Sequence, residues 1–184
     1  MNIANKLTIL RIILIPFFIL CFYIDALNRP FTVVGIYTTY ANVTGLLVFG
    51  IAAITDWLDG HLARKLDLIS DFGKFMDPLA DKMLTTAAFL IFITQGLLAS
   101  WVVFIILTRE FMVSGLRMTA ASKGIIIAAG LSGKLKTVLQ FTAIIALLIH
   151  PELTILNVIL IYSMTIATVV SGVEYIVKNI SVFK

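Results

Sequence analysis

Apolar residues follow one another in six long runs along the chain, and short polar segments separate the runs. Each run has about the 20 residues that a helix needs to cross a bilayer. The runs predict helices over residues 7–27, 41–65, 72–94, 101–121, 125–149 and 153–177. The connection that holds Asn28, Arg29, Pro30 and Gly35 is polar and predicts a loop. We therefore expect an all-α integral membrane protein with six transmembrane helices, in a single domain over residues 1–184.

The overall composition agrees with a membrane protein. Hydrophobic residues make up 60% of the chain, charged residues only 13%, and the mean hydropathy is +1.07. Soluble domains are far less apolar. The net charge of +4 does not indicate nucleic-acid binding, because the basic residues stand at the ends of the apolar runs and form no basic tract.

The positions of the basic residues predict how the chain is oriented. Six spans place both termini on one side of the membrane, and of the 14 Lys and Arg residues only Arg29 falls on the other side. Cytoplasmic segments of membrane proteins carry the excess of Lys and Arg. We expect a multi-pass protein of the cell membrane with both termini, and the acidic segment described next, on the cytoplasmic side.

An acidic segment, residues 56–81, interrupts this apolar chain with the sequence DWLDGHLARKLDLISDFGKFMDPLAD. Four of its aspartates recur at helical spacing, namely Asp56, Asp59, Asp77 and Asp81. On a helix, the first two share one face with Gly60 and Arg64, and the last two share a face with Gly73. The spacing predicts two helical faces whose carboxylates converge.

Converging carboxylates repel one another unless a cation lies between them. Carboxylate oxygens are the ligands that Mg²⁺ and Mn²⁺ prefer, and the chain has no Cys or His cluster that would favour a softer metal. The alternative is that these acids stand at the membrane surface and pair with neighbouring basic residues such as Arg64, Lys65, Lys74 and Lys82. Four acids beside two glycines favour the metal site, because glycines allow a phosphate to approach the backbone closely.

A second group of charges is basic. Arg109 and Arg117 lie eight residues apart on one helical face, and Lys134 stands near the start of the next run on the same side. Arginine suits two-point binding of a phosphate, and lysine supplies a point charge. We expect Glu110 to point to another side of its helix. The alternative for Arg117 and Lys136 is contact with lipid headgroups. An acidic metal site beside a basic anion site suits metal-assisted transfer of a phosphoryl-type group.

The acidic segment also resembles a known family. The pattern Asp56-x2-Asp59-Gly60-x2-Ala63-Arg64-x8-Gly73-x3-Asp77-x3-Asp81 is the signature of the CDP-alcohol phosphotransferases, with every position present. Other segments look like the bacterial branch that makes phosphatidylglycerophosphate: Asn5-x2-Thr8-x2-Arg11, Thr108-Arg109-Glu110-Phe111, Ser114-Gly115-Leu116-Arg117, Gly133-Lys134-x-Lys136-Thr137 and Ser171-Gly172-Val173-Glu174-Tyr175. Ala4 stands where that branch often has proline, a small departure.

The resemblance implies an enzyme of six membrane helices, usually a homodimer among membrane lipids, whose site opens to the cytoplasm. Two divalent ions, Mg²⁺ or Mn²⁺, would be held by Asp56, Asp59, Asp77 and Asp81, and Asp81 would be the general base. Residues implied to bind the donor, CDP-diacylglycerol, are Asn5, Thr8, Gly60, Arg64 and Gly73. Residues implied to bind the acceptor, sn-glycerol 3-phosphate, are Arg109, Arg117 and Lys134. The products would be phosphatidylglycerophosphate and CMP.

Two alternatives stay open at this point. A member of the same family could use another acceptor, such as inositol phosphate or phosphatidylglycerol; the basic group disfavours serine, which has no phosphate. A divalent-cation transporter would also keep aspartates in membrane helices, but such proteins usually bind ions near the bilayer midplane between repeated halves. Here the acids stand at one end of the predicted helices, and no repeat is visible.

Overall fold

The structure, a computed structural model, describes residues 3–180 apart from 34, 67–70, 125–126 and 128–129, and the described part is mostly helical. Within the helices, the side chains of residues 3–6, 56–66, 71–75, 77–78 and 81 are outside the described part as well. The elements are α1 (Ile3–Tyr23), β1 (Pro30–Val33), β2 (Ile36–Thr39), α2 (Tyr40–Leu66), α3 (Asp71–Thr94), α4 (Ser100–Ser122), α5 (Leu131–Ile149) and α6 (Ile155–Lys178).

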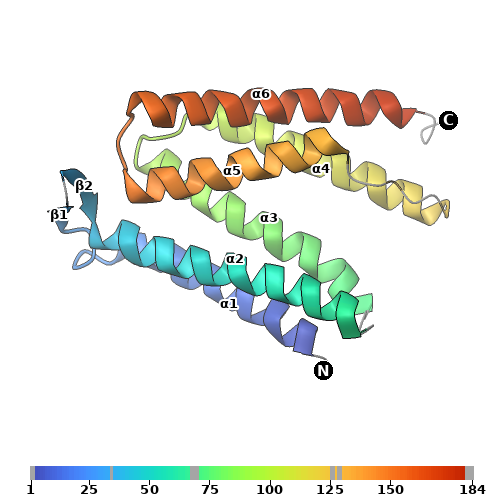
Figure 1. The fold of residues 1–184 in the computed structure, drawn as a ribbon, viewed down its shortest axis with the longest axis horizontal. Helices are drawn as coiled ribbons and strands as arrows, with labels where there is room; N and C mark the ends of the chain where they lie inside the picture. Colours follow the sequence, from blue (N-terminus) through green and yellow to red (C-terminus); the bar gives the residue numbers. More distant parts are fainter. Residues whose placement is uncertain (1–2, 34, 67–70, 125–126, 128–129, 181–184) are drawn as a thin grey trace.

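The helices alternate in direction along the molecule (Figure 1). Helices α1 and α2 lie side by side at one edge, α5 and α6 pack on each other at the other, and α4 packs on α6. Helix α3 lies between these groups and contacts α1, α2, α4 and α5. As a result, α1 begins, α2 ends, α3 begins, α4 ends and α6 ends at the same end of the molecule (Figure 1).

Phenylalanine and aliphatic side chains fill the centre between the helices. Phe18, Phe49 and Phe92 are each at most 1% exposed, and the ring centroids of Phe18 and Phe49 are 6.2 Å apart. Gly45 lets α1 and α2 approach, because a Cβ atom there would come within 2.6 Å of the Phe22 ring. Close packing of this kind is the main attraction between helices that are surrounded by lipid.

The outer faces of the helices are apolar as well. Large side chains such as Phe104 (71% exposed) and Leu131 (84% exposed) have little protein around them. An apolar surface this extensive is unusual in a soluble monomer and suits contact with lipid. In the described part of the chain, two helices are long and apolar enough to cross a membrane, Leu131–Ile149 and Ile155–Lys178. Shorter apolar stretches of α1, α2 and α3 accompany them. The count of six spans stays a prediction.

Three details differ from the sequence-based expectations, and the first is that α1 spans Ile3–Tyr23 instead of residues 7–27. The polar connection after α1 contains a two-stranded antiparallel hairpin, in which Phe31 pairs with Thr38 and Val33 with Ile36. Its β-branched and aromatic residues favour strands, and Gly35 supplies the positive φ of 80° at the turn. Helix α5 begins at Leu131 instead of about residue 125, after an extended Gly130 with φ −72° and ψ 166°.

The connection between α5 and α6 is held by one buried side chain. Asn157 is 2% exposed, and its Nδ2 atom donates to the carbonyl oxygens of His150 (2.9 Å) and Glu152 (2.6 Å). Its backbone N–H donates to the Thr154 hydroxyl at 3.3 Å, which caps the start of α6. The amide of Asn157 therefore fixes the path by which the chain reverses between these helices.

We expect Asn157→Ala to lower the free energy of unfolding by about 2 kcal/mol, because two carbonyl groups lose their partners at a buried position. Unfolding of the purified protein in detergent, followed by circular dichroism, measures this. Asn28→Ala is the matched control, since the side chain of exposed Asn28 donates only once, to the Phe22 carbonyl at 3.0 Å. Equal effects of the two substitutions would contradict the role given to Asn157.

Candidate functional site

The four predicted metal ligands lie on two consecutive helices. Asp56 and Asp59 are in the C-terminal part of α2, and Asp77 and Asp81 are in the N-terminal half of α3. Helices α2 and α3 contact each other, and these two parts lie at the same end of the molecule (Figure 1). The helical spacing expected for each pair is confirmed. The four side chains are outside the described part, so their convergence on a metal stays a prediction.

Most of the residues predicted to bind the donor are also outside the described part. The side chains of Asn5 and Arg64 are not described, and neither are the surroundings of Gly60 and Gly73. Thr8 is described and is completely buried in α1, and Arg11, one turn further on, is completely buried too. A buried arginine in an apolar protein usually has a function. Arg11 lies in the helix that packs against both acid-bearing helices, α2 and α3.

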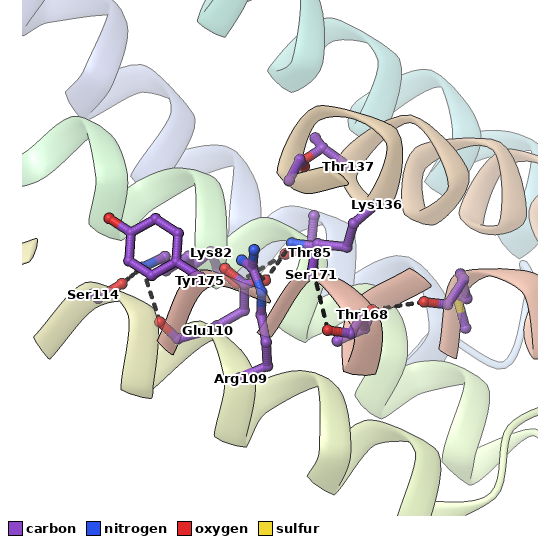
Figure 2. Close-up of polar contacts among 12 residues, drawn as sticks. Lys82, Thr85, Arg109, Glu110, Ser114, Lys136, Thr137, Thr168, Ser171 and Tyr175 are labelled. Atoms are coloured by element: carbon purple, nitrogen blue, oxygen red, sulfur yellow. Dashed lines mark hydrogen bonds and ion pairs between the residues drawn. The ribbon is translucent and has the colours of Figure 1, made fainter. Parts of the chain in front are cut away.

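Charged side chains of three helices meet around Glu110 of α4 (Figure 2). Its Oε1 atom accepts from Arg109 Nη1 at 3.3 Å and from Lys136 Nζ, which belongs to α5. Lys82 of α3 donates to the hydroxyl of Ser114 and approaches the backbone carbonyl of Glu110 at 3.5 Å. We call Lys82, Arg109, Glu110 and Lys136 the buried charge cluster. Two cations, Arg109 and Lys136, share the Glu110 carboxylate, and Lys82 contacts the backbone of the same residue.

A cleft of about 170 Å³ lies beside this cluster, between α4, α6 and the start of α5. Arg109 and Arg117 both line it, as predicted for an anion site. Arg117 donates from Nε to the Tyr175 hydroxyl at 3.0 Å, and its guanidinium carbon is 5.4 Å from the centroid of that ring. Ser132 and Glu174 line the same cleft.

One glycine makes room for the Arg109 side chain, and a second lies next to it. A Cβ atom on Gly172 of α6 would come within 2.9 Å of Arg109 Cγ, and one on Gly133 of α5 would be 3.6 Å from Nη2. The Nε atom of Arg109 is buried and has no hydrogen-bond partner among the described residues. A buried donor without a partner is costly, and a bound oxyanion in the cleft would satisfy it.

Lys134 and Lys136 have different environments. Lys134 is exposed and does not line the cleft, whereas the Lys136 side chain is only 6% exposed and contacts Glu110. Two residues along a helix correspond to a rotation of about 200°, so the two lysines occupy opposite faces. The acceptor-binding role of Lys134 stays a prediction, and Lys136 is the cation of this pair that belongs to the buried charge cluster.

The expectation for Glu110 was wrong. Its carboxylate turns back to the neighbouring Arg109 instead of pointing elsewhere, because Lys136 of α5 lies on that side. One feature of the sequence could have predicted the contact between Glu110 and these cations. Glu110 is the only acidic residue in α4 and α5, which carry Arg109, Arg117, Lys134 and Lys136, and charges within apolar helices pair with one another.

An apolar groove of about 210 Å³ runs between α4 and α6 on another side of Arg109. Most of its lining is aliphatic or aromatic, including Phe104, Met112, Val169 and Val173, all of which are exposed. Arg109 lines both the groove and the cleft. An apolar groove that also contains Arg109 suits an amphiphile with an acyl chain and an anionic head.

Comparison with known proteins agrees with the resemblance noted in the sequence. Residues 1–172 match the CDP-alcohol phosphatidyltransferase family. The chain belongs to this family. The match covers the acidic segment, both arginines of the cleft and the buried charge cluster, so these features stand inside the family's domain.

Several bacterial members of the family are similar over nearly their full length. A CDP-diacylglycerol–glycerol-3-phosphate 3-phosphatidyltransferase of Bacillus subtilis (strain 168) is 42% identical over 183 residues, which cover 97% of this chain and 95% of the relative. A protein of the same name from Haemophilus influenzae is 39% identical, with 95% and 91% covered. A probable phosphatidylglycerophosphate synthase of Mycobacterium tuberculosis (strain H37Rv) is 36% identical, with 96% and 81% covered.

We expect Gly172→Ala to displace Arg109 from the cleft, because the added methyl group would lie too close to Cγ, near the stem of the side chain. The KM for the phosphorylated acceptor should rise about tenfold, the cost of losing a charged hydrogen bond. Steady-state kinetics of CMP release measure this.

Gly50→Ala is the matched control, since a Cβ atom on this α2 glycine would meet nothing within 4 Å. An unchanged KM in Gly172→Ala would show that the position of Arg109 does not depend on this glycine.

Proposed function

We propose that this protein transfers the phosphatidyl group of CDP-diacylglycerol to sn-glycerol 3-phosphate, giving phosphatidylglycerophosphate and CMP. The observation that carries the proposal is the cleft lined by Arg109 and Arg117, in which the buried Nε–H of Arg109 has no partner among the described residues. The names of the bacterial relatives, which cover nearly the whole chain, support the same substrates.

The cleft suits an acceptor that carries a phosphate. Arg109 offers a buried Nε–H without a partner among the described residues, and Arg117 is oriented by Tyr175. Guanidinium groups bind phosphate through two parallel hydrogen bonds. With the phosphate held there, the glycerol end of the acceptor remains free to reach the diphosphate of the donor. Lys134 would add a further positive charge from the first turn of α5.

In the transfer itself, the primary hydroxyl oxygen of the acceptor attacks the phosphorus that carries the diacylglycerol. The bond from this phosphorus to the oxygen of the CMP phosphate breaks, and CMP leaves with that electron pair. Asp81 takes the proton of the attacking hydroxyl as general base. Asn5, Thr8, Gly60, Arg64 and Gly73 would hold the donor.

The acids of α2 and α3 fit a pair of divalent cations, because all four are carboxylates, the donors that Mg²⁺ and Mn²⁺ prefer. Asp56, Asp59, Asp77 and Asp81 would hold these ions. When bound, the ions would neutralise charge on the diphosphate and on the CMP leaving group.

The expected setting is the cell membrane. The apolar outer surface and the two helices that meet the length and hydropathy of a span support membrane insertion. We infer six spans, both termini and the site on the cytoplasmic side, and a homodimer. The groove between α4 and α6 would take an acyl chain of the lipid. The alternative within the family is another acceptor alcohol, and a cation transporter is the alternative outside it.

An acceptor panel tests the proposal. We expect the purified protein to release CMP from CDP-diacylglycerol with sn-glycerol 3-phosphate, and at least about tenfold more slowly with serine, inositol phosphate or phosphatidylglycerol, because each differs from glycerol phosphate in charge or size. Mass spectrometry of the lipid product identifies phosphatidylglycerophosphate. Faster release with another acceptor would assign the chain to that reaction, and metal-dependent ion flux without CMP release would favour a transporter.

Substitution of the proposed base gives a separate test. We expect Asp81→Asn to reduce kcat at least about a thousandfold, because the amide neither accepts the proton nor carries the negative charge that a cation requires. Excess EDTA should abolish wild-type turnover, and Mg²⁺ or Mn²⁺ should restore it. Near-normal turnover of the variant would show that another group is the base.

A further inference from the structure

Glu110 has an unusual position among the charges of the molecule. It is the only acid of α4 and α5, its side chain is 15% exposed, and one of its oxygens accepts from two cations on different helices. Arg109 and Lys136 are similarly enclosed, with 12% and 6% of their side chains exposed. Burying such a charge costs free energy, and attraction to its partners offsets this cost only when the geometry is good.

The nitrogens of the Arg109 guanidinium have different surroundings. Nη1 is engaged by Glu110 at 3.3 Å. On the other side, Nη2 lies next to Gly133 of the cleft, and Nε is buried without a partner among the described residues. Nε and Nη2 form the side-on fork of a guanidinium, the edge that binds two oxygens of one phosphate. Glu110 therefore occupies the end of Arg109 that the phosphate does not need.

Lys136 in turn determines where the carboxylate lies. Its ammonium group contacts the same Oε1 atom from α5, which holds the carboxylate between two helices, and Glu110 does not line the cleft. Lys82 approaches the backbone carbonyl of Glu110 from α3 and fixes that turn of α4 (Figure 2). Lys136 therefore holds the carboxylate, and the carboxylate holds the Arg109 guanidinium.

We propose that Glu110 is a positioning residue for the acceptor: together with Lys136 it holds the Arg109 guanidinium with the Nε and Nη2 edge toward the acceptor's phosphate. Glu110 acts through Arg109 and does not touch the substrate. The inference rests on the proposed function. It adds an explanation of how Arg109 can bind an anion although the carboxylate of Glu110 lies next to it.

A double-mutant cycle tests this inference in the full-length protein in detergent. The variants are Glu110→Gln, Lys136→Met and the two combined, with kcat and KM determined for sn-glycerol 3-phosphate and for CDP-diacylglycerol. Each single substitution should raise the KM for sn-glycerol 3-phosphate about tenfold and leave that for CDP-diacylglycerol within about twofold. The double variant should resemble the single ones, because the residues act as one unit.

Glu152→Gln is the matched control, since exposed Glu152 lies in the connection between α5 and α6; its KM values should equal those of wild type. Unchanged KM values in Glu110→Gln, additive effects of about a hundredfold in the double variant, or equal increases for both substrates would overturn the inference. A lower unfolding temperature with unchanged KM would do the same, because it indicates a structural role alone.

Two further measurements keep the outcomes separate. If Glu110→Gln does not fold, the double variant, in which position 136 carries no charge, replaces it, and a wild-type KM there would overturn the inference. Wild-type protein that releases no CMP with sn-glycerol 3-phosphate contradicts the proposed function instead. Calorimetric titration of sn-glycerol 3-phosphate into wild type and Glu110→Gln then tests the positioning role, and equal affinities would refute it.

Discussion

The pairing of enclosed charges is the interaction on which the arrangement of α3, α4 and α5 depends. Glu110 joins Arg109 to Lys136 across two helices, and Lys82 approaches the same residue from a third. In an apolar interior an uncompensated charge is very costly. Once these four residues are placed in facing helices, few arrangements satisfy all of them, so the cluster restricts how the helices can rotate about their axes.

The buried charge cluster also places a cation where an anion can bind. Arg109 belongs to the cluster and also lines the cleft, where Arg117 is the second arginine. Gly172 allows the Arg109 side chain to pass α6 without a clash. An enzyme that transfers phosphorylated groups needs an anion site of this kind, and the proposed metal-binding acids lie in the neighbouring α2 and α3. In this chain Lys82, which belongs to the cluster, directly follows Asp81 in sequence.

Much of the helical framework was predictable, because long apolar runs and helical spacing of charges are local properties. The helices at residues 40–66, 71–94 and 100–122 begin and end within a few residues of the expected positions. The hairpin at Pro30–Thr39 was missed, because a short strand pair depends on its partner strand more than on its own composition. The late start of α5 was missed because Gly130, in an extended conformation, precedes it within an apolar stretch.

The sequence by itself determined the family, the helical character, and the grouping of acids on two helices and of arginines on another, since each follows from residue type and spacing along the chain. Only the tertiary structure decided that Lys136 enters the buried charge cluster while Lys134 is exposed, and that Glu110 contacts Arg109. Spacing within one helix says which residues share a face, whereas the partner of a charge depends on how neighbouring helices are rotated and packed.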